Sequence, residues 1–182
     1  MSVIAPGSYR LRRLPELLVP KYVVPIEVSG PTNFVLLAVW AKRNPGAPYV
    51  EGVVRAVRAY RDLISQNATV IAGDLNSNKI WDHKRAADLS HSGLVALAAE
   101  LGLTSSYHAF YKEAQGEESQ ATFYFQWKKN RPYHIDYVFV PETWLPHLSR
   151  VEVGSYEGWK IHSDHRPVVV TVDLPSATCP IS

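Results

Sequence analysis

The sequence predicts a layered α/β sandwich with mostly antiparallel or mixed sheets, and three observations lead to this fold class. Short β-branched and apolar segments bounded by turn residues outnumber the segments with helical periodicity. Two consecutive strands are separated by a turn that favours a hairpin. Two helical segments each have an apolar face, which a sheet would cover. This order of elements argues against a doubly wound parallel sheet.

The hairpin is predicted near the N-terminus. Residues 21–28 and 34–40 are rich in β-branched and apolar side chains, while residues 29–33 are Ser, Gly, Pro, Thr and Asn. These intervening residues are typical of turns, so we expect an antiparallel pair of strands.

Two helices are predicted between the later strands. The apolar residues Val53, Val57, Tyr60 and Ile64 recur at helical spacing, with charged residues between them, which predicts one continuous amphipathic helix. Residues 93–101 repeat leucine and alanine at the same spacing and form the second predicted helix.

The remaining strands are short. They are predicted at residues 69–72, 122–125, 134–140, 151–153 and 168–172. The first of them is fully apolar and is followed at once by polar residues, an arrangement that places polar side chains at the mouth of a sheet. Chemistry is commonly found at such positions.

Length and composition favour a single domain over residues 1–174, followed by a disordered tail at residues 175–182 that is rich in Pro, Ser and Thr. The net charge of +2 is too small to indicate nucleic-acid binding by itself. No apolar run approaches the roughly 20 residues that span a bilayer, so no membrane contact is expected. The single cysteine, Cys179, excludes an internal disulfide and favours a cytoplasmic setting.

Three polar segments interrupt this apolar framework. GDLN at residues 73–76 follows a predicted strand, HIDY at residues 134–137 opens another, and SDHRP at residues 163–167 precedes a third. Each segment alone is weak evidence, because short patterns occur by chance. Their order along the chain is the stronger evidence for a shared site.

Each segment also has a simpler interpretation. Asp74 and Asn76 alone would more often form a turn after a strand, and His165 alone would more often be a surface histidine. Asp136 is harder to explain in this way, because an unpaired carboxylate within an apolar strand is costly and a histidine partner would relieve that cost.

Taken together, the three segments resemble the later motifs of the endonuclease/exonuclease/phosphatase family, over about residues 22–174. The resemblance implies a metal-dependent phosphodiester hydrolase, most directly a nuclease acting on DNA. It implies that Asp136 and His165 form a pair and that Asp74 orients or deprotonates the attacking water. Asn76 would donate to a phosphoryl oxygen, and Asp164 with Asp74 would hold the metal.

The implied cofactor is Mg²⁺ or Mn²⁺, because the candidate ligands are carboxylate and amide oxygens without a thiolate. Asn76, Asn78, Trp81 and His134 are candidate substrate-binding residues, since they lie within or close to the motifs. Trp81 is equally well interpreted as an aromatic residue that packs the loop. The partner would be nucleic acid or another phosphodiester substrate.

The resemblance also implies that the first strands of the family fold are missing, together with an Asn and a Gln-Glu pair that carries the principal metal ligand. A naturally short protein, a truncated gene, and half of a site completed by another chain all remain open explanations. The alternative function is a catalytically weak or inactive module that binds phosphate or nucleic acid. Because missing strands would expose apolar sheet surface, we expect a homo-oligomer, specifically a two-fold dimer.

Overall fold

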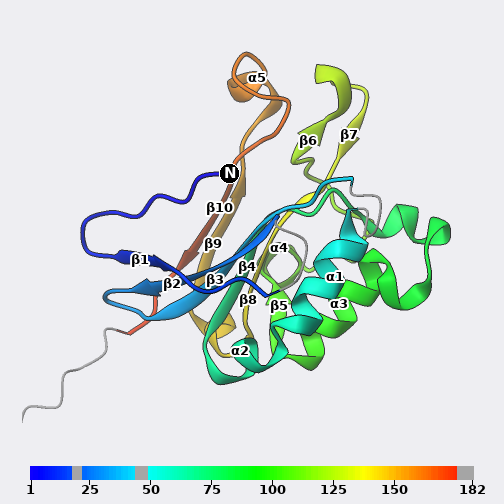
Figure 1. The fold of residues 1–182 in the computed structure, drawn as a ribbon. Coiled ribbons are helices and arrows are strands. Elements are labelled where there is room, and N and C mark those ends of the chain that lie inside the picture. The colour runs from blue at the N-terminus through cyan, green and yellow to red at the C-terminus, as the bar shows by residue number, and fades with distance from the viewer. Residues whose placement is uncertain (18–21, 44–48, 176–182) are drawn as a thin grey trace, which may run out of the picture.

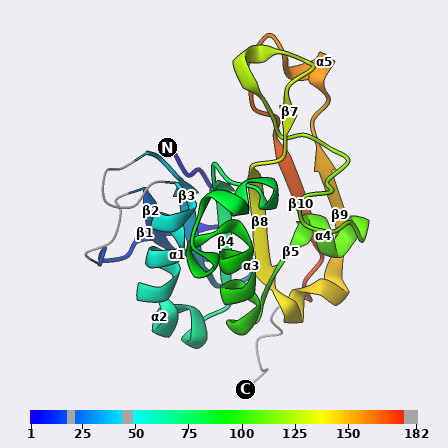
Figure 2. The same cartoon turned by 90° about the vertical axis from the view of Figure 1, so that its right-hand side faces the viewer.

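A computed structural model describes residues 1–17, 22–43 and 49–175 of the 182-residue chain. The elements form layers around one six-stranded sheet. Figures 1 and 2 show the long helices α1 (Val50–Ala59) and α3 (His91–Glu100) against one face of this sheet, with the strands β9 (Leu148–Val153) and β10 (Val168–Val172) on the other side. The predicted layered α/β architecture is confirmed.

The six-stranded sheet has the order β1-β2-β3-β4-β8-β5. Only β3 and β4 pair in parallel, and the other neighbours are antiparallel. Its strands are β1 (Arg10–Arg13), β2 (Val23–Ser29), β3 (Phe34–Trp40), β4 (Thr69–Asp74), β5 (Leu103–Ser105) and β8 (Asp136–Pro141). The mixed pairing agrees with the sequence prediction.

The predicted hairpin is β2 with β3, whose register runs from Val23 opposite Val39 to Val28 opposite Phe34. The turn between them is closed in part by Asn33, whose Oδ1 accepts a hydrogen bond from Gly30 N at 3.0 Å. This is the local side-chain contact that makes Asn favourable in turns.

The prediction of one continuous helix after residue 50 is wrong, because this segment forms two helices. α1 ends at Ala59 and α2 (Arg61–Gln66) begins after Tyr60, which has φ −89° and ψ 12°. Both Tyr60 and Ile64 remain buried, at 3% exposure. The apolar residues on both sides of the break therefore face the core, although the helix is interrupted at Tyr60.

The main core lies between the helices and the sheet. Leu37 and Ile71 from the sheet and Val53 from α1 are at most 1% exposed. Truncating such a side chain typically costs about 2–5 kcal/mol, so this face dominates the stability of the domain. No helix in the described part of the chain is long and apolar enough to cross a membrane.

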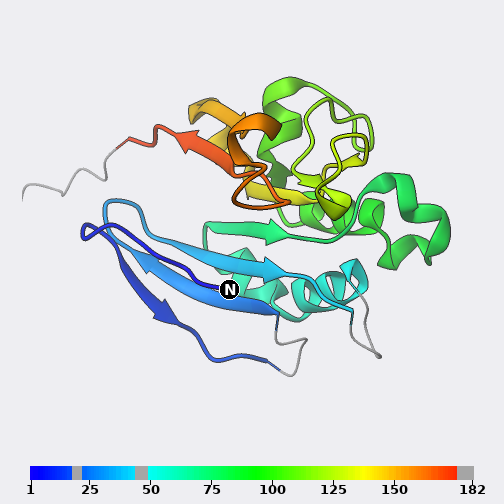
Figure 3. The same ribbon diagram turned by 90° about the horizontal axis from the view of Figure 1, so that it is seen from above.

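The second layer is a two-stranded antiparallel sheet formed by β9 and β10. It is held by α4 (Ser106–Tyr111), because the Tyr111 hydroxyl donates to the Val151 carbonyl at 2.7 Å. Val169 of β10 is 48% exposed, so much of this ribbon faces solvent. Figure 3 shows this two-stranded sheet from above, beside β8.

Two projections rise from the same end of the molecule (Figure 1). One is the hairpin of β6 (Phe123–Tyr124) and β7 (Pro132–Tyr133), and the other is the loop that carries α5 (Tyr156–Trp159). The buried Arg166 guanidinium lies 4.7 Å from the Tyr124 ring centroid and 5.0 Å from that of Tyr156. Because those rings belong to different projections, Arg166 joins the two projections through cation-π contacts.

The remaining elements are short turns of 3₁₀ helix: η1 (Lys79–Lys84), η2 (Ala87–Leu89), η3 (Phe125–Trp127) and η4 (Glu142–His147). The strands β5 and β7 and the helices α4 and α5 were not predicted. Residues 176–182 of the predicted disordered tail lie outside the described residues, as does Cys179.

Gly73, next to the end of β4, allows a close approach of two strands. It has φ +136°, and a Cβ at this position would lie 2.0 Å from the Val39 carbonyl oxygen. We expect Gly73→Ala to lower the free energy of unfolding by about 3 kcal/mol or more, because both the dihedral and the contact become unfavourable. Urea denaturation followed by circular dichroism measures this change.

The matched control is Gly7→Ala, because a Cβ at Gly7 meets nothing within 4 Å. The control should change the free energy of unfolding by no more than about 0.5 kcal/mol. Equal denaturation midpoints for the two variants would contradict this account of the β3–β4 contact.

Candidate active site

Two carboxylates meet where β4 ends and β8 begins. Asp74 is the last residue of β4, Asp136 is the first residue of β8, and the antiparallel register places them directly opposite each other. Opposed residues in an antiparallel pair have neighbouring side chains when these lie on the same face. The first two sequence motifs are therefore brought together by one pairing of strands.

Asn76 holds the Asp74 carboxylate from the following loop. Its backbone N–H donates to Asp74 Oδ1 and its Nδ2 donates to Asp74 Oδ2, each at 2.8 Å. The same Nδ2 donates to the Ala41 carbonyl at 2.8 Å, so both amide hydrogens have acceptors. Asn76 has φ 46°, a left-handed conformation that asparagine tolerates better than most residues.

The third motif adds a histidine. His165 Nδ1 lies 3.0 Å from Asp136 Oδ2 and 3.2 Å from Oδ1, so the ring N–H donates to the carboxylate. The His165 side chain is 34% exposed and that of Asp136 is 18% exposed. The expected contact between these two residues is present, and it fixes Nδ1 as the protonated nitrogen while Nε2 remains for another partner.

The electrostatics of the site shift two pKa values upward. Burial, followed by repulsion from Asp136, raises the pKa of Asp74 to about 7. Burial disfavours the charged form of His165, but the hydrogen bond and charge of Asp136 outweigh it and raise the pKa of His165. Near neutral pH the Asp74 carboxyl group is therefore poised to exchange a proton.

Asp164 contributes a further negative charge. Its charge raises the pKa of both Asp74 and His165, which places it near the pair. No group of three or more His, Cys, Asp or Glu side chains with metal-binding geometry occurs among the described residues. The donor set nevertheless fits a hard divalent cation, because its oxygen ligands repel one another and Mg²⁺ commonly keeps several waters.

Asn78 and His134 lie behind this site. They are 3% and 4% exposed, respectively. His134 Nδ1 donates to the Gln120 carbonyl at 2.7 Å, and its Nε2 is buried with no hydrogen-bond partner in the described part of the chain. Burial lowers the pKa of His134 and keeps the ring neutral.

Trp81 faces a cavity of about 400 Å³ beside Asn76. The Trp81 and Tyr133 rings lie 5.2 Å apart, and Phe123 and Phe125 also line the cavity. The Phe123 ring in turn lies 4.7 Å from the His165 ring, which connects the aromatic cavity to the Asp136–His165 pair. Of the predicted substrate-binding residues, the partly exposed Asn76 and Trp81 and the buried Asn78 line this space, and His134 does not.

Several residues of the site were not found from the sequence. Glu118, His108 and Tyr137 form a hydrogen-bonded group behind Asn78. Glu118 lies in a segment without strand or helix periodicity, where an acidic residue is expected to be solvated. Only tertiary contacts reveal that its side chain is 4% exposed.

The raised pKa of Asp74 makes stability depend on pH. Well below the ordinary pKa of 3.8 the carboxyl group is protonated in both the folded and unfolded states. As pH rises to about 7, the unfolded state ionises first and the folded state loses stability. We expect Asp74→Asn to remove this loss, which is on the order of 2–4 kcal/mol above pH 7.

The measurement is urea denaturation of wild type and variant between pH 4 and pH 8, with a chelator present to exclude divalent cations. The stability difference between the two proteins should grow in favour of the variant as pH rises. Parallel curves over the whole range would show that Asp74 ionises with an ordinary pKa.

Comparisons with known proteins identify the fold. No family model matches the chain, and no curated protein sequence matches it. Among solved structures, the endonuclease domain of TRAS1, a telomere-specific non-LTR retrotransposon, superposes with a TM-score of 0.65 at 17% identity, covering 93% of this chain and 71% of that domain.

Two other solved structures agree. The 3′-5′ exonuclease NExo from Neisseria meningitidis has a TM-score of 0.60 at 19% identity and covers 82% of this chain. The AP endonuclease LMAP from Leishmania major has a TM-score of 0.66 at 15% identity and covers 92%. The chain spans 65% and 62% of these two proteins. The fold is therefore that of the endonuclease/exonuclease/phosphatase domains, as the three sequence motifs predicted.

Proposed function

We propose that the protein is a metal-dependent phosphodiester hydrolase that acts on DNA. The observation that carries this proposal is the hydrogen bond from His165 to Asp136, beside Asp74, at the shared end of β4 and β8. An imidazole oriented by one carboxylate, next to a second carboxylate with a pKa near 7, supplies the proton transfers that hydrolysis requires.

In this proposal Asp74 orients the attacking water and accepts its proton as the water oxygen bonds to phosphorus and the bond to the leaving oxygen breaks. His165 presents Nε2 to a phosphoryl oxygen while Asp136 keeps the ring in place. Asn76 releases one of its amide hydrogens from Asp74 or Ala41 and donates it to the phosphate.

Asp164 and Asp74 are the residues that would hold Mg²⁺ or Mn²⁺. A bound divalent cation offsets negative charge on the phosphoryl and leaving oxygens. Their carboxylates supply hard oxygen ligands and already repel each other, so cation binding would also relieve the upward shift of the Asp74 pKa.

DNA is favoured as substrate by the surroundings of the site. The structural neighbours include an endonuclease domain, an exonuclease and an AP endonuclease, all nucleases of the same fold. The aromatic cavity beside Asn76 offers ring faces on which a nucleotide can stack. The β6–β7 projection adds the exposed basic residues Lys128 and Arg131, which suit a phosphate backbone.

A binding module without catalysis is the second candidate, because no group of three or more metal-binding side chains occurs in the described ranges. Such a module would use the same aromatic cavity and basic projection to bind nucleic acid, but it would not cleave the bound strand.

We also propose a cytoplasmic location for the protein. This proposal rests on the amino-acid composition alone.

The test is cleavage of a fluorescent oligonucleotide, with and without an abasic site, across a Mn²⁺ or Mg²⁺ titration. We expect activity that rises with metal, and at least a 100-fold lower kcat in Asp74→Asn and His165→Ala, because general acid–base groups contribute about 10²–10⁴-fold. His147→Ala is the matched control, because this histidine lies in η4, away from the motifs.

Metal-saturated wild type that cleaves no faster than either variant would reject catalysis at this site. Fluorescence anisotropy on the same oligonucleotides separates the two candidates. Retained binding without turnover would favour the binding module, and the loss of both would reject a nucleic-acid substrate.

We also propose that the protein forms a two-fold homodimer. The supporting observation is a hollow bordered by exposed apolar side chains, including Leu11 at 36% and Trp40 at 43% exposure, along the solvent-exposed edge strand β1. Isologous pairing would bury the same surface on both copies. Multi-angle light scattering should give twice the chain mass, and a monomer from micromolar to millimolar concentration would contradict the proposal.

A further inference from the structure

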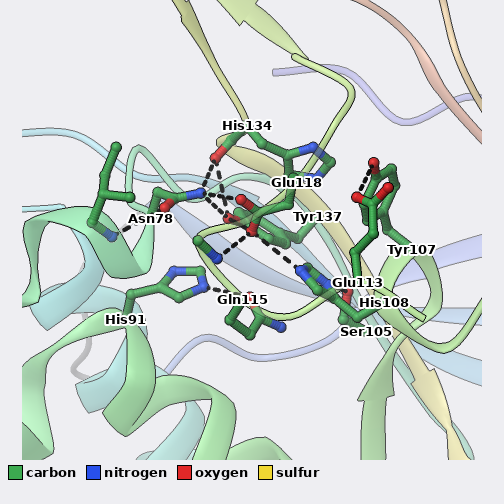
Figure 4. Close-up of polar contacts among 12 residues, drawn as sticks. Asn78, His91, Ser105, Tyr107, His108, Glu113, Gln115, Glu118, His134 and Tyr137 are labelled. Atoms are coloured by element: carbon green, nitrogen blue, oxygen red, sulfur yellow. Dashed lines mark hydrogen bonds and ion pairs between the residues drawn. The ribbon is translucent and has the colours of Figure 1, made fainter. Parts of the chain in front are cut away.

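Figure 4 shows a polar network around Asn78 and Glu118. Its central members are Asn78, Glu118, His108, His134 and Tyr137, joined by hydrogen bonds and ring contacts. The Glu118 side chain is 4% exposed and that of His108 is 10% exposed. Burying so many polar groups is costly unless each has a partner, so the network calls for a structural reason.

Asn78 bridges two segments of the chain. Its Nδ2 donates to the His134 carbonyl at 3.0 Å and contacts the Tyr137 hydroxyl at 3.1 Å. Its Oδ1 accepts from Ile80 N at 3.1 Å and caps the helix η1. One amide therefore fastens the loop after β4 to the turn before β8.

Glu118 determines how that amide is oriented. Its Oε2 accepts from Asn78 Nδ2 at 3.0 Å, while its Oε1 accepts from His108 Nε2 at 3.1 Å and from Gly116 N at 3.0 Å. Burial opposes ionisation of Glu118, but these hydrogen bonds lower its pKa to about 2. Because both oxygens accept, the Asn78 nitrogen must face Glu118 and the Asn78 oxygen must face Ile80.

The two fastened segments are the ones that carry the candidate catalytic groups. Asn78 follows Asn76 by two residues, and His134 precedes Asp136 by two. Between the two segments, Leu75 N donates to the Ile135 carbonyl at 2.9 Å. A change at Asn78 therefore reaches the active site through only two residues on either side.

We propose that Asn78 and Glu118 are positioning residues that set the separation of the segment bearing Asp74 and Asn76, at the end of β4, from the start of β8, which bears Asp136. Asn78 and Glu118 would affect the reaction by holding these two segments in place. They would not contact the substrate, which would bind to Asp74, Asn76 and His165. The proposal rests on the proposed hydrolytic function for its kinetic consequence. Its structural consequence, the fixed spacing of the two segments, stands without that function.

Glu118→Gln is the sharpest variant, because it keeps the size of the side chain and removes one acceptor. If the oxygen of the substituted amide keeps its bonds from His108 and Gly116, its NH₂ group faces the NH₂ group of Asn78, and two donors meet. If Asn78 turns over to avoid this, it loses both the Ile80 cap and the His134 carbonyl. Either way the link between the segments opens.

We expect Glu118→Gln to lower kcat for oligonucleotide cleavage about 10- to 100-fold with KM changed less than about twofold, since displaced catalytic groups lose rate more than binding. Two controls should keep the wild-type kcat. Glu117→Gln removes the neighbouring exposed charge, and Tyr60→Phe removes a buried hydroxyl that accepts from Leu17 N, far from the site.

Amide hydrogen exchange measured by NMR is the second readout. In Glu118→Gln, exchange at the amides of Leu75 and Ile80 should accelerate, while amides in the hairpin of β2 and β3 stay as protected as in the wild type. Wild-type kcat in the variant, or equal acceleration throughout the sheet, would overturn the positioning role.

The two readouts also separate this proposal from the proposed function. An inactive wild type would reject the hydrolase and leave exchange at Leu75 and Ile80 to decide the positioning role. Accelerated exchange there would support that role, and unchanged exchange would refute it. An active wild type with an unaffected Glu118→Gln variant would reject positioning and keep the hydrolase.

Discussion

The antiparallel pairing of β4 with β8 is the constraint on which the site depends. It places Asp74 opposite Asp136, and so it brings together two carboxylates that are 62 residues apart in the sequence. This arrangement has an electrostatic cost, since repulsion from Asp136 adds to burial in raising the pKa of Asp74 to about 7. Other interactions near the site have to compensate for that cost, and they are mainly hydrogen bonds to the two carboxylates and to the segments that carry them.

The compensation comes from both sides of the pair. In front, Asn76 donates twice to Asp74, and His165 donates to Asp136. Behind, Asn78 and Glu118 tie together the two segments that carry these groups. The core between the helices and the sheet holds β4 in its parallel pairing with β3, which Gly73 permits. The contacts that stabilise this end of the sheet are therefore also the contacts that hold the candidate site together.

Much of this arrangement could be predicted from the sequence, and the misses have physical reasons. The motif residues Asp74, Asp136 and His165 stand out because polar groups interrupt or flank apolar strands. The break at Tyr60 was invisible, because apolar spacing continues across it. Glu118 could not be found, because its burial arises from contacts with residues distant in sequence, and a loop carboxylate gives no periodic signal.

The most direct test of the account is a crystal structure of the protein with Mn²⁺ and a short phosphorothioate oligonucleotide that resists cleavage. The account predicts anomalous density for manganese between Asp74 and Asp164, with a phosphoryl oxygen within hydrogen-bonding distance of His165 Nε2. An oligonucleotide bound away from β4 and β8, with the Asp136–His165 pair unoccupied, would contradict the claim that this pairing of strands builds a phosphodiesterase site.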